Sequence, residues 1–256
     1  MLLLMRSESM LDKTAFSVAL NRAIGKVRDG EKIGTLGEKL LHRTLKYYFE
    51  PDESKHEIAC FGSVADIRNE KGITEIQTRS FSKLAPKLER FLPEERVTIV
   101  YPIVENKFIC RINTETGESL TPRKGPKRGR VSDALAEISM IRRFVPDDRL
   151  TVLVIMVDLT ETRMQNREIR VGRKRTSKLN AIPMGINRII SLDTPDDYRQ
   201  LLPADMPKSF TAEEFEKLFG FKKINAHGAL MLLLQLGILT RERKGREPYT
   251  YSLNNA

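Results

Sequence analysis

The pattern of apolar and polar residues predicts two helices near the start of the chain. In residues 35–50 the apolar side chains recur every three or four positions, which is the spacing of one helix face. Residues 14–30 show the same amphipathic character, and Pro51 ends the second segment. We expect a helix in each segment, and we expect the second helix to pack on a sheet.

Short runs of apolar residues with strand character follow these helices. We expect strands at residues 56–68, 72–78, 96–103, 107–112 and 149–159. Helical spacing returns at residues 80–93, where Pro86 interrupts it, and at residues 132–144. Residues 114–120 have the composition of a hairpin turn. The pattern therefore predicts an α/β (α+β) fold in which a mixed central sheet is flanked by helices.

The pattern changes near residue 195, at the start of a stretch rich in proline and aspartate. A capped helix at residues 211–220, an apolar helix at 224–239 and a hairpin at 240–253 follow in that order. This order resembles a winged helix-turn-helix. We therefore expect a larger domain at residues 1–195 and a small C-terminal winged-helix domain at residues 196–256.

The composition adds a net charge of +10 to a chain of 256 residues that is 40% apolar. A protein this basic usually has an anionic partner, most often nucleic acid, although a solubilising surface would also be basic. The basic residues are dense in segments 123–130 and 163–179, which we expect to be exposed loops that contact phosphates. Two ordinary solvated loops are the alternative.

The cysteines indicate a reducing compartment, and the lengths of the apolar runs indicate that the chain does not span a membrane. The two cysteines lie far apart in apolar surroundings, and no Cys/His spacing suggests zinc. No apolar run reaches the ~20 residues of a membrane span. We expect a cytoplasmic protein with no membrane partner.

Two carboxylates occupy unusual positions in the predicted hairpin at residues 62–84. If the turn pairs Arg68 with Ile73, then Asp66 lies opposite Glu75 on the neighbouring strand. Like charges in that position repel each other unless a cation lies between them, and Mg²⁺ prefers oxygen ligands of this kind. Glu38 lies on the apolar stripe of the second helix, where a carboxylate also needs a partner.

These residues resemble the PD-(D/E)xK nuclease superfamily, in which a helix with Glu, a strand ending in Asp, a turn and a strand with Glu-x-Lys follow one another. The resemblance covers roughly residues 31–110, with Glu38, Asp66 and "EIQ" at Glu75–Gln77. The chain has Gln77 where the family usually has lysine, and Ala65 where the family name implies proline. Glutamine can orient a water molecule but adds no charge.

The resemblance implies a restriction-endonuclease-like fold and a metal-dependent DNA endonuclease, in a restriction-modification, defence or repair role. Asp66, Glu75 and the Ile76 carbonyl would bind Mg²⁺ or Mn²⁺, and Gln77 would position the attacking water. Glu38 would bind a second ion or its waters. Double-strand cleavage would suggest a homodimer, although no dimer surface is evident in the sequence.

The nuclease resemblance, the two basic segments and the winged-helix pattern together predict contacts between basic or polar side chains and DNA. The expected residues are Arg79, Lys83, Arg123, Lys124, Lys127, Arg128, Arg130, Arg170, Arg173, Lys174, Arg175, Lys178, Lys222, Lys223, Asn225, Arg241, Arg243, Lys244 and Arg246. The C-terminal module could instead bind protein.

Each carboxylate also has an ordinary structural explanation, because Asp66 could begin a turn, Glu75 could face solvent, and Glu38 could lie on a helix surface. The alternative function is a DNA-binding regulator or accessory protein without catalysis, built on a decayed nuclease fold.

Overall fold

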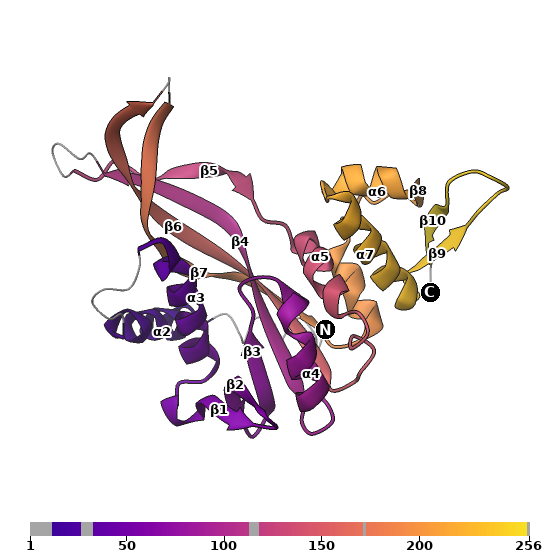
Figure 1. Cartoon of the computed structure of the whole chain (residues 1–256), viewed down its shortest axis with the longest axis horizontal. Helices are drawn as coiled ribbons and strands as arrows, with labels where there is room; N and C mark the ends of the chain where they lie inside the picture. Colours follow the sequence, from indigo (N-terminus) through magenta and orange to yellow (C-terminus); the bar gives the residue numbers. More distant parts are fainter. Residues whose placement is uncertain (1–11, 27–32, 113–117, 171–172, 255–256) are drawn as a thin grey trace. The chain divides into compact units, whose positions relative to one another are not determined.

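A computed structural model of the chain describes residues 12–26, 33–112, 118–170 and 173–254, without the side chains of 33–37 and 165–179. The chain forms two compact units (Figure 1). Unit 1 consists of residues Met1–Ile58, Pro102–Gly129 and Ile155–Ile189, and unit 2 consists of Ala59–Tyr101, Arg130–Val154 and Ile190–Ala256. The division into two domains that we expect at residue 195 stays a prediction.

Unit 1 contains the two helices that the periodicity predicts, α2 (Lys13–Gly25) and α3 (Ile33–Phe49). The side chain of Asp12 caps α2 by accepting hydrogen bonds from the first backbone N–H groups. Small residues on α2 allow close packing against α3, since Ala19 and Ala23 share a buried cluster with Leu40 and Tyr47. The apolar stripes of the two helices thus cover one another.

Several strands are longer than the sequence pattern predicts. Strand β4 (Val97–Ile112) joins the two strands expected at 96–103 and 107–112 into one. Strands β6 (Leu150–Arg170) and β7 (Arg173–Leu192) include the segment 163–179, so the expected basic loop there is wrong. Strand β5 (Arg123–Arg128) likewise replaces the expected loop at 123–130, because it pairs antiparallel with β4. The hydrogen bonds of a neighbouring strand outweigh the polar composition of these segments.

The sheet has the strand order β1-β2-β3-β4-β6-β7, and β5 pairs with β4. The expected strand at 56–68 is two strands, β1 (His56–Cys60) and β2 (Ser63–Asn69), because Phe61 and Gly62 have positive φ angles and turn the chain. Strand β3 (Gly72–Ile76) pairs antiparallel with β2 and parallel with β4. The predicted mixed sheet with flanking helices is confirmed.

The parallel pairing of β3 with β4 requires a crossover, and helix α4 (Ala85–Phe91) supplies it. A 3₁₀ turn at Phe81–Lys83 precedes this helix, and Pro86 lies in its first turn, where it needs no N–H partner. The proline therefore begins the helix instead of breaking it. The apolar side chains of Phe81, Leu88 and Phe91 are fully buried.

The helix predicted at 132–144 is a short helix α5 (Ala134–Ile138) between two 3₁₀ turns, Val131–Asp133 and Ser139–Ile141. Helix α7 (Lys223–Gln235) contacts both α5 and the second of these turns. Gly228 makes this contact possible, because a Cβ atom there would lie 2.6 Å from the hydroxyl oxygen of Ser139. The two segments therefore pack with almost no space between them.

The C-terminal elements follow the predicted order. A 3₁₀ turn at Pro195–Leu201 precedes β8 (Ser209–Thr211), α6 (Ala212–Phe219), α7, β9 (Leu239–Glu242) and β10 (Thr250–Leu253). Thr211 and Glu214 form a capping box at the start of α6, and Gly220 ends it with a φ of 62°. The three strands form a small sheet in the order β8-β10-β9, so β10 is its central strand.

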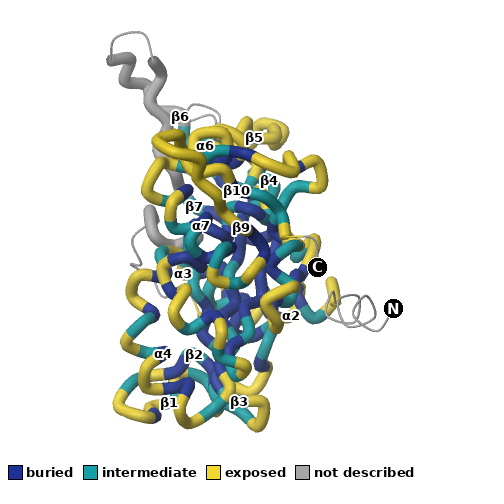
Figure 2. The backbone as a smooth tube through the Cα atoms, turned by 90° about the vertical axis from the view of Figure 1, so that its right-hand side faces the viewer, coloured by how far each residue is buried: buried dark blue, intermediate teal, exposed yellow. Residues whose placement is uncertain are grey.

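Buried residues, dark blue in Figure 2, are concentrated in the strands and on the inner faces of the helices, while the loops are exposed. Phe210, Phe215, Phe219 and Tyr251 form the aromatic core around the small sheet, with ring pairs stacked 4.2 to 6.1 Å apart. Among the described residues, no helix is long and apolar enough to cross a membrane.

Candidate functional site

The hairpin of β2 and β3 brings the two predicted carboxylates together. Arg68 pairs with Ile73 and Ile67 pairs with Thr74, which confirms the register inferred from the turn. Beyond these pairs the hydrogen bonds between the strands come from side chains. The N–H of Ile76 donates to Asp66 Oδ2 at 2.8 Å, and the N–H of Asp66 donates to Glu75 Oε1 at 3.3 Å. Asp66 and Glu75 therefore hold the ends of the two strands.

Glu75 is the more deeply placed carboxylate. It is only 3% exposed, whereas Asp66 is half-buried. Burial raises the pKa of Glu75 above its usual value, and the negative charge of Asp66 raises it further. Two acidic groups in this position strongly favour a cation between or beside them.

Lys87 supplies a cation that the sequence analysis missed. Its Nζ atom lies 2.7 Å from Glu75 Oε2 and donates to the carbonyl of Val64 at 2.8 Å. Lys87 lies on α4, four residues after the predicted Lys83, which is exposed. The i, i+4 spacing of the two lysines was the available signal, but only the packing of α4 decides which of them reaches the carboxylates.

The structure gives Gln77 a local role. Its Nε2 atom donates to the carbonyl of Ser80 at 2.7 Å, and its backbone N–H donates to Val100 on β4 at 2.9 Å. Glu38 is half-buried on α3 and belongs to unit 1, whereas Asp66, Glu75 and Gln77 belong to unit 2. Its expected place beside them stays a prediction.

A hard cation such as Mg²⁺ requires several oxygen ligands. Among the residues that the structure describes, no group of three or more His, Cys, Asp or Glu side chains could hold a metal ion. Mg²⁺, however, is commonly bound by one or two carboxylates, and phosphate and water oxygens complete its shell. Asp66, Glu75 and the Ile76 carbonyl fit that description, provided that Lys87 leaves Glu75.

The expected DNA-contacting side chains of β5 and its flanks are exposed, but two of them have structural partners. Arg128 pairs with Glu105 at 2.6 Å. Arg130 donates to the carbonyls of Leu218 and Phe219, the last residues of α6, so this guanidinium caps a helix C-terminus. The side chains of Arg170, Arg173, Lys174, Arg175 and Lys178 lie outside the described part of the chain.

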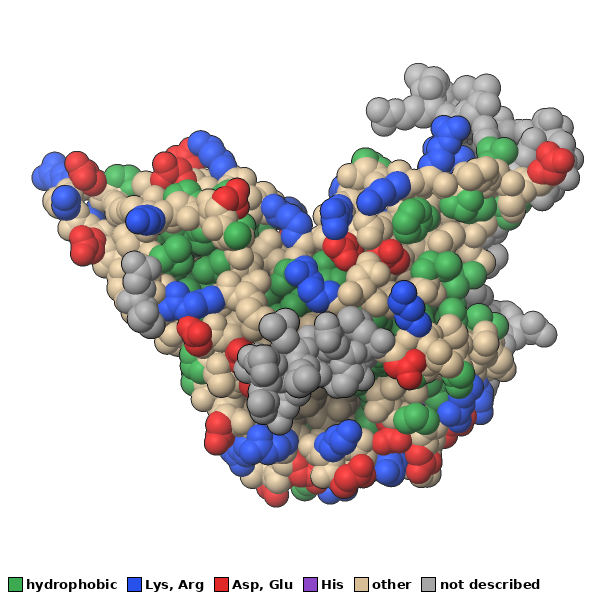
Figure 3. Space-filling view, turned by 180° about the vertical axis from the view of Figure 1, so that it is seen from behind, with side chains coloured by type: hydrophobic (Ala, Val, Ile, Leu, Met, Phe, Trp, Pro, Cys, Tyr) green, Lys and Arg blue, Asp and Glu red, His purple; other side chains and the backbone are tan. Residues whose placement is uncertain are grey.

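The expected contact residues of the C-terminal module are largely exposed. Those on or beside α7 are Lys222, Lys223 and the half-buried Asn225. Arg241 and Arg243 lie over the ring of Tyr249, 5.0 and 5.3 Å from its centroid, and Lys244 and Arg246 lie in the β9–β10 turn. Arg79 is also exposed. On the face drawn in Figure 3, basic side chains (blue) alternate with acidic ones (red) and form no continuous patch among the drawn residues.

Fold and site together define a mixed α/β protein with a carboxylate pair on adjacent strands. The model of the family described as a domain of unknown function (DUF8091) matches residues 39–193, which is more than half of the 256 residues. The chain belongs to this family. The matched region includes Asp66, Glu75 and Lys87, and it excludes Glu38 and the C-terminal module.

A relative is similar in sequence to this chain over most of the length of both proteins. An "uncharacterized protein" of Treponema pallidum (strain Nichols) is 27% identical over 222 residues, which cover 84% of this chain and 85% of that protein. No solved structure matches the chain.

Proposed function

We propose that the chain is a metal-dependent DNA endonuclease of the PD-(D/E)xK type. The observation that carries the proposal is the meeting of Asp66 and Glu75 where the β2–β3 ladder ends, beside an ammonium group from α4. Two acids and a lysine in one place match the needs of phosphodiester hydrolysis, which requires charge neutralisation and an oriented water.

The order of elements supports the restriction-endonuclease-like assignment. Helix α3, a strand that carries Asp66, a tight turn, a strand with Glu75 and helix α4 follow one another along the chain. This is the order of the superfamily pattern that residues 31–110 resemble. The family usually has a lysine two residues after the glutamate, and here Lys87 is the lysine that contacts Glu75.

Each residue of the site has a separate role in the proposed reaction. Asp66, Glu75 and the Ile76 carbonyl would hold Mg²⁺ or Mn²⁺, and the ion would supply Lewis-acid activation of water and neutralise the phosphate. Lys87 moves from Glu75 to a phosphate oxygen when DNA is bound. Gln77 fixes the turn after β3 through Ser80.

The C-terminal module supports DNA as the substrate. Its elements β8, α6, α7, β9 and β10 and its sheet order β8-β10-β9 suit a winged helix, in which the second helix enters a groove. The exposed cations on α7 and in the β9–β10 turn would contact phosphates.

A second candidate is a DNA-binding protein without catalysis. The ion pair between Lys87 and Glu75 favours it, because the ammonium group occupies one of the oxygens that a metal ion would need. The engagement of Gln77 with Ser80 favours it too, because that amide is then turned to a structural contact.

Cleavage of supercoiled plasmid with Mg²⁺ or Mn²⁺ tests the proposal. We expect nicking or linearisation by the wild type and its loss in Asp66→Asn and Glu75→Gln. Glu89→Gln is a matched control, because Glu89 is an exposed carboxylate on the same helix as Lys87 and forms an ion pair with Arg143.

The same variants separate the two candidates. No cleavage by any protein, together with salt-dependent DNA binding that Asp66→Asn retains, would overturn the nuclease and favour the binding protein. Cleavage that Asp66→Asn and Glu75→Gln retain would place the activity elsewhere.

A further inference from the structure

Unit 1 contains a cavity of about 470 Å³ whose lining is dominated by charge. Three cationic side chains line it, Lys26 at the end of α2 and Arg43 and Lys46 on α3. Two glutamates, Glu53 and Glu57, line it as well. The cavity shares no residue with the carboxylate pair on β2 and β3, so an inference drawn from it does not rest on the proposed nuclease.

Lys46 is the fixed charge of this cavity. Its side chain is only 9% exposed, and a buried ammonium group needs an anionic partner. That partner is Glu57, whose Oε1 lies 2.7 Å from Lys46 Nζ. The side chain of Glu57 is 72% exposed, so water and solutes reach the carboxylate although they scarcely reach the lysine.

The backbone of Glu57 is strained. Its φ is 53°, in the left-handed region that favours glycine, although it lies within strand β1. Strained residues that the surroundings maintain are concentrated at functional sites. Here the strained residue is the one that supplies an exchangeable carboxylate to a buried lysine.

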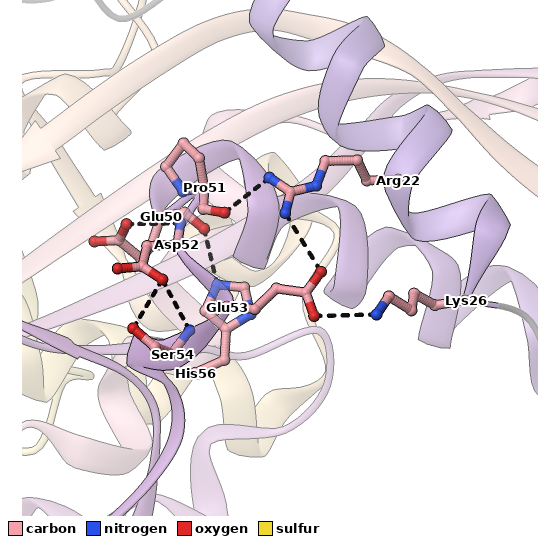
Figure 4. Close-up of polar contacts among 8 residues, drawn as sticks. All are labelled: Arg22, Lys26, Glu50, Pro51, Asp52, Glu53, Ser54 and His56. Carbon is pink, nitrogen blue, oxygen red and sulfur yellow. Dashed lines mark hydrogen bonds and ion pairs between the residues drawn. The ribbon is translucent and has the colours of Figure 1, made fainter.

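Glu53, the second glutamate of the cavity, is also exposed to solvent and neutralises the charge of nearby cations. Figure 4 shows Glu53 between Arg22 and Lys26, at 3.3 and 3.1 Å. Its side chain is 44% exposed. Arg22 also donates to the carbonyl of Pro51, and the His56 ring contacts the carbonyl of Glu50, so the backbone holds these groups beside the cavity.

We propose that this cavity binds a phosphate monoester of nucleotide size, whose phosphate displaces the Glu57 carboxylate from Lys46. A phosphate dianion offers more charge and more acceptor oxygens than one carboxylate, which suits Lys46 together with the guanidinium of Arg43 and the ammonium of Lys26. The rings of Tyr47 and His56, 5.3 Å apart, supply the less polar part of the lining.

Calorimetric titration of the full chain with thymidine monophosphate, thymidine and inorganic phosphate tests the proposal. We expect the monophosphate to bind and thymidine not to bind. Lys46→Met should weaken binding by about tenfold or more, since one charge-assisted hydrogen bond is lost. Glu57→Gln should strengthen it several-fold, because the competing carboxylate is removed.

Lys55→Met is the matched control. Lys55 is a lysine near the cavity that pairs with Glu50 at 3.9 Å and does not line the cavity. Lys55→Met removes the same charge as Lys46→Met. Because Lys55 does not line the cavity, this variant should bind with an affinity within about twofold of the wild type. Circular dichroism melting shows whether each variant is folded, and Glu57→Gln keeps the test decisive if Lys46→Met does not fold.

A second pair of probes distinguishes the 5′-phosphate of a nucleic acid from the phosphate of a free nucleotide. Tight binding of a 5′-phosphorylated oligonucleotide over its 5′-hydroxyl form, sensitive to Lys46→Met, would support the site and assign it to nucleic-acid ends. Tight binding of the free monophosphate alone would support it as a nucleotide site. Equal affinity for thymidine and its monophosphate, or equal losses in Lys46→Met and Lys55→Met, would overturn the proposal.

Discussion

Two lysine–glutamate pairs of this protein have the same length and opposite burial. Lys87 and Glu75 in unit 2 lie 2.7 Å apart, and the glutamate side chain is 4% exposed while the lysine is 31% exposed. Lys46 and Glu57 in unit 1 also lie 2.7 Å apart, but there the lysine is 9% exposed and the glutamate 72%. In each pair the fold buries one charge and leaves its partner near solvent.

The difference shows which ligand each site would accept. The buried member is fixed by packing, whereas the exposed member can be replaced by a solute of the same sign. A buried glutamate beside Asp66 therefore favours cations, and a buried lysine beside Arg43 favours anions. In the two proposals, the same type of ion pair would therefore serve opposite chemistries.

The largest expected effect follows from removing the exposed lysine of the first pair. Lys87→Met leaves Glu75 buried beside Asp66 without its cation, and it should lower the free energy of unfolding by about 2–4 kcal/mol. Glu75→Gln should cost less, because it also removes the repulsion between the two acids. Urea denaturation at pH 7 measures both.

A third pair of the same length provides the control. Lys217 and Glu213 on α6 also lie 2.7 Å apart, but both side chains are more than 70% exposed. Lys217→Met should leave the denaturation midpoint almost unchanged. A loss in Lys87→Met no larger than in Lys217→Met would show that burial of Glu75 does not govern the site.

A smaller effect is expected from the turn that sets the carboxylate register. Gly72 has a φ of 107°, and a Cβ atom there would collide with the backbone carbonyl of Arg96. Gly72→Ala should therefore cost about 1–3 kcal/mol. Gly245→Ala in the β9–β10 turn is the control for a positive φ alone, because nothing lies near its added Cβ. Equal losses in the two variants would remove the contact with Arg96 from the explanation.

The pH dependence of the first pair is expected to be smaller again. Since the folded-state pKa of Glu75 is raised, the native protein holds this proton to higher pH than the unfolded chain does. Stability from this group is lost as the pH rises from about 4.5 through the raised pKa, with a slope of at most about 1.4 kcal/mol per pH unit. Across pH 4–8 the urea midpoint of Glu75→Gln should therefore rise relative to that of the wild type. Parallel curves would contradict the assignment.

The smallest expected effect is the pH dependence of stability that comes from Glu53, a glutamate that lines the cavity in unit 1. The hydrogen bond from Lys26, and then that from Tyr47, lowers the pKa of Glu53. The stability that Glu53 contributes is present above its ordinary pKa and is lost as the pH falls through the lowered value. Thermal melts of wild type and Glu53→Gln should therefore differ at pH 7 and converge in acid, the opposite trend to Glu75. A difference that persists at low pH would exclude the charge as its cause.

The sequence predicts those features whose causes are local. The helical spacing of α3, the capping box of α6 and the turn that pairs Arg68 with Ile73 all depend on residues close in sequence. The carboxylate pair followed directly from that turn. These elements were predicted within a few residues of their observed bounds.

The features that were missed depend on distant partners. Strand β5 and the basic part of β6 and β7 form because neighbouring strands supply hydrogen bonds that the composition does not reveal. Arg130 caps a helix that ends 89 residues further along the chain. Lys87 reaches Glu75 only because α4 crosses from β3 to β4. Local periodicity alone determines none of these contacts.

The contact between α7 and the turn at Ser139–Ile141 has a consequence for how this chain can vary. Because a methyl group at position 228 would lie 2.6 Å from the hydroxyl oxygen and 3.2 Å from the Cβ atom of Ser139, a side chain at position 228 requires the Ser139 side chain to move or to become smaller. Glycine at 228 and a small residue at 139 should therefore be inherited together. A library that randomises both positions would recover them as a linked pair.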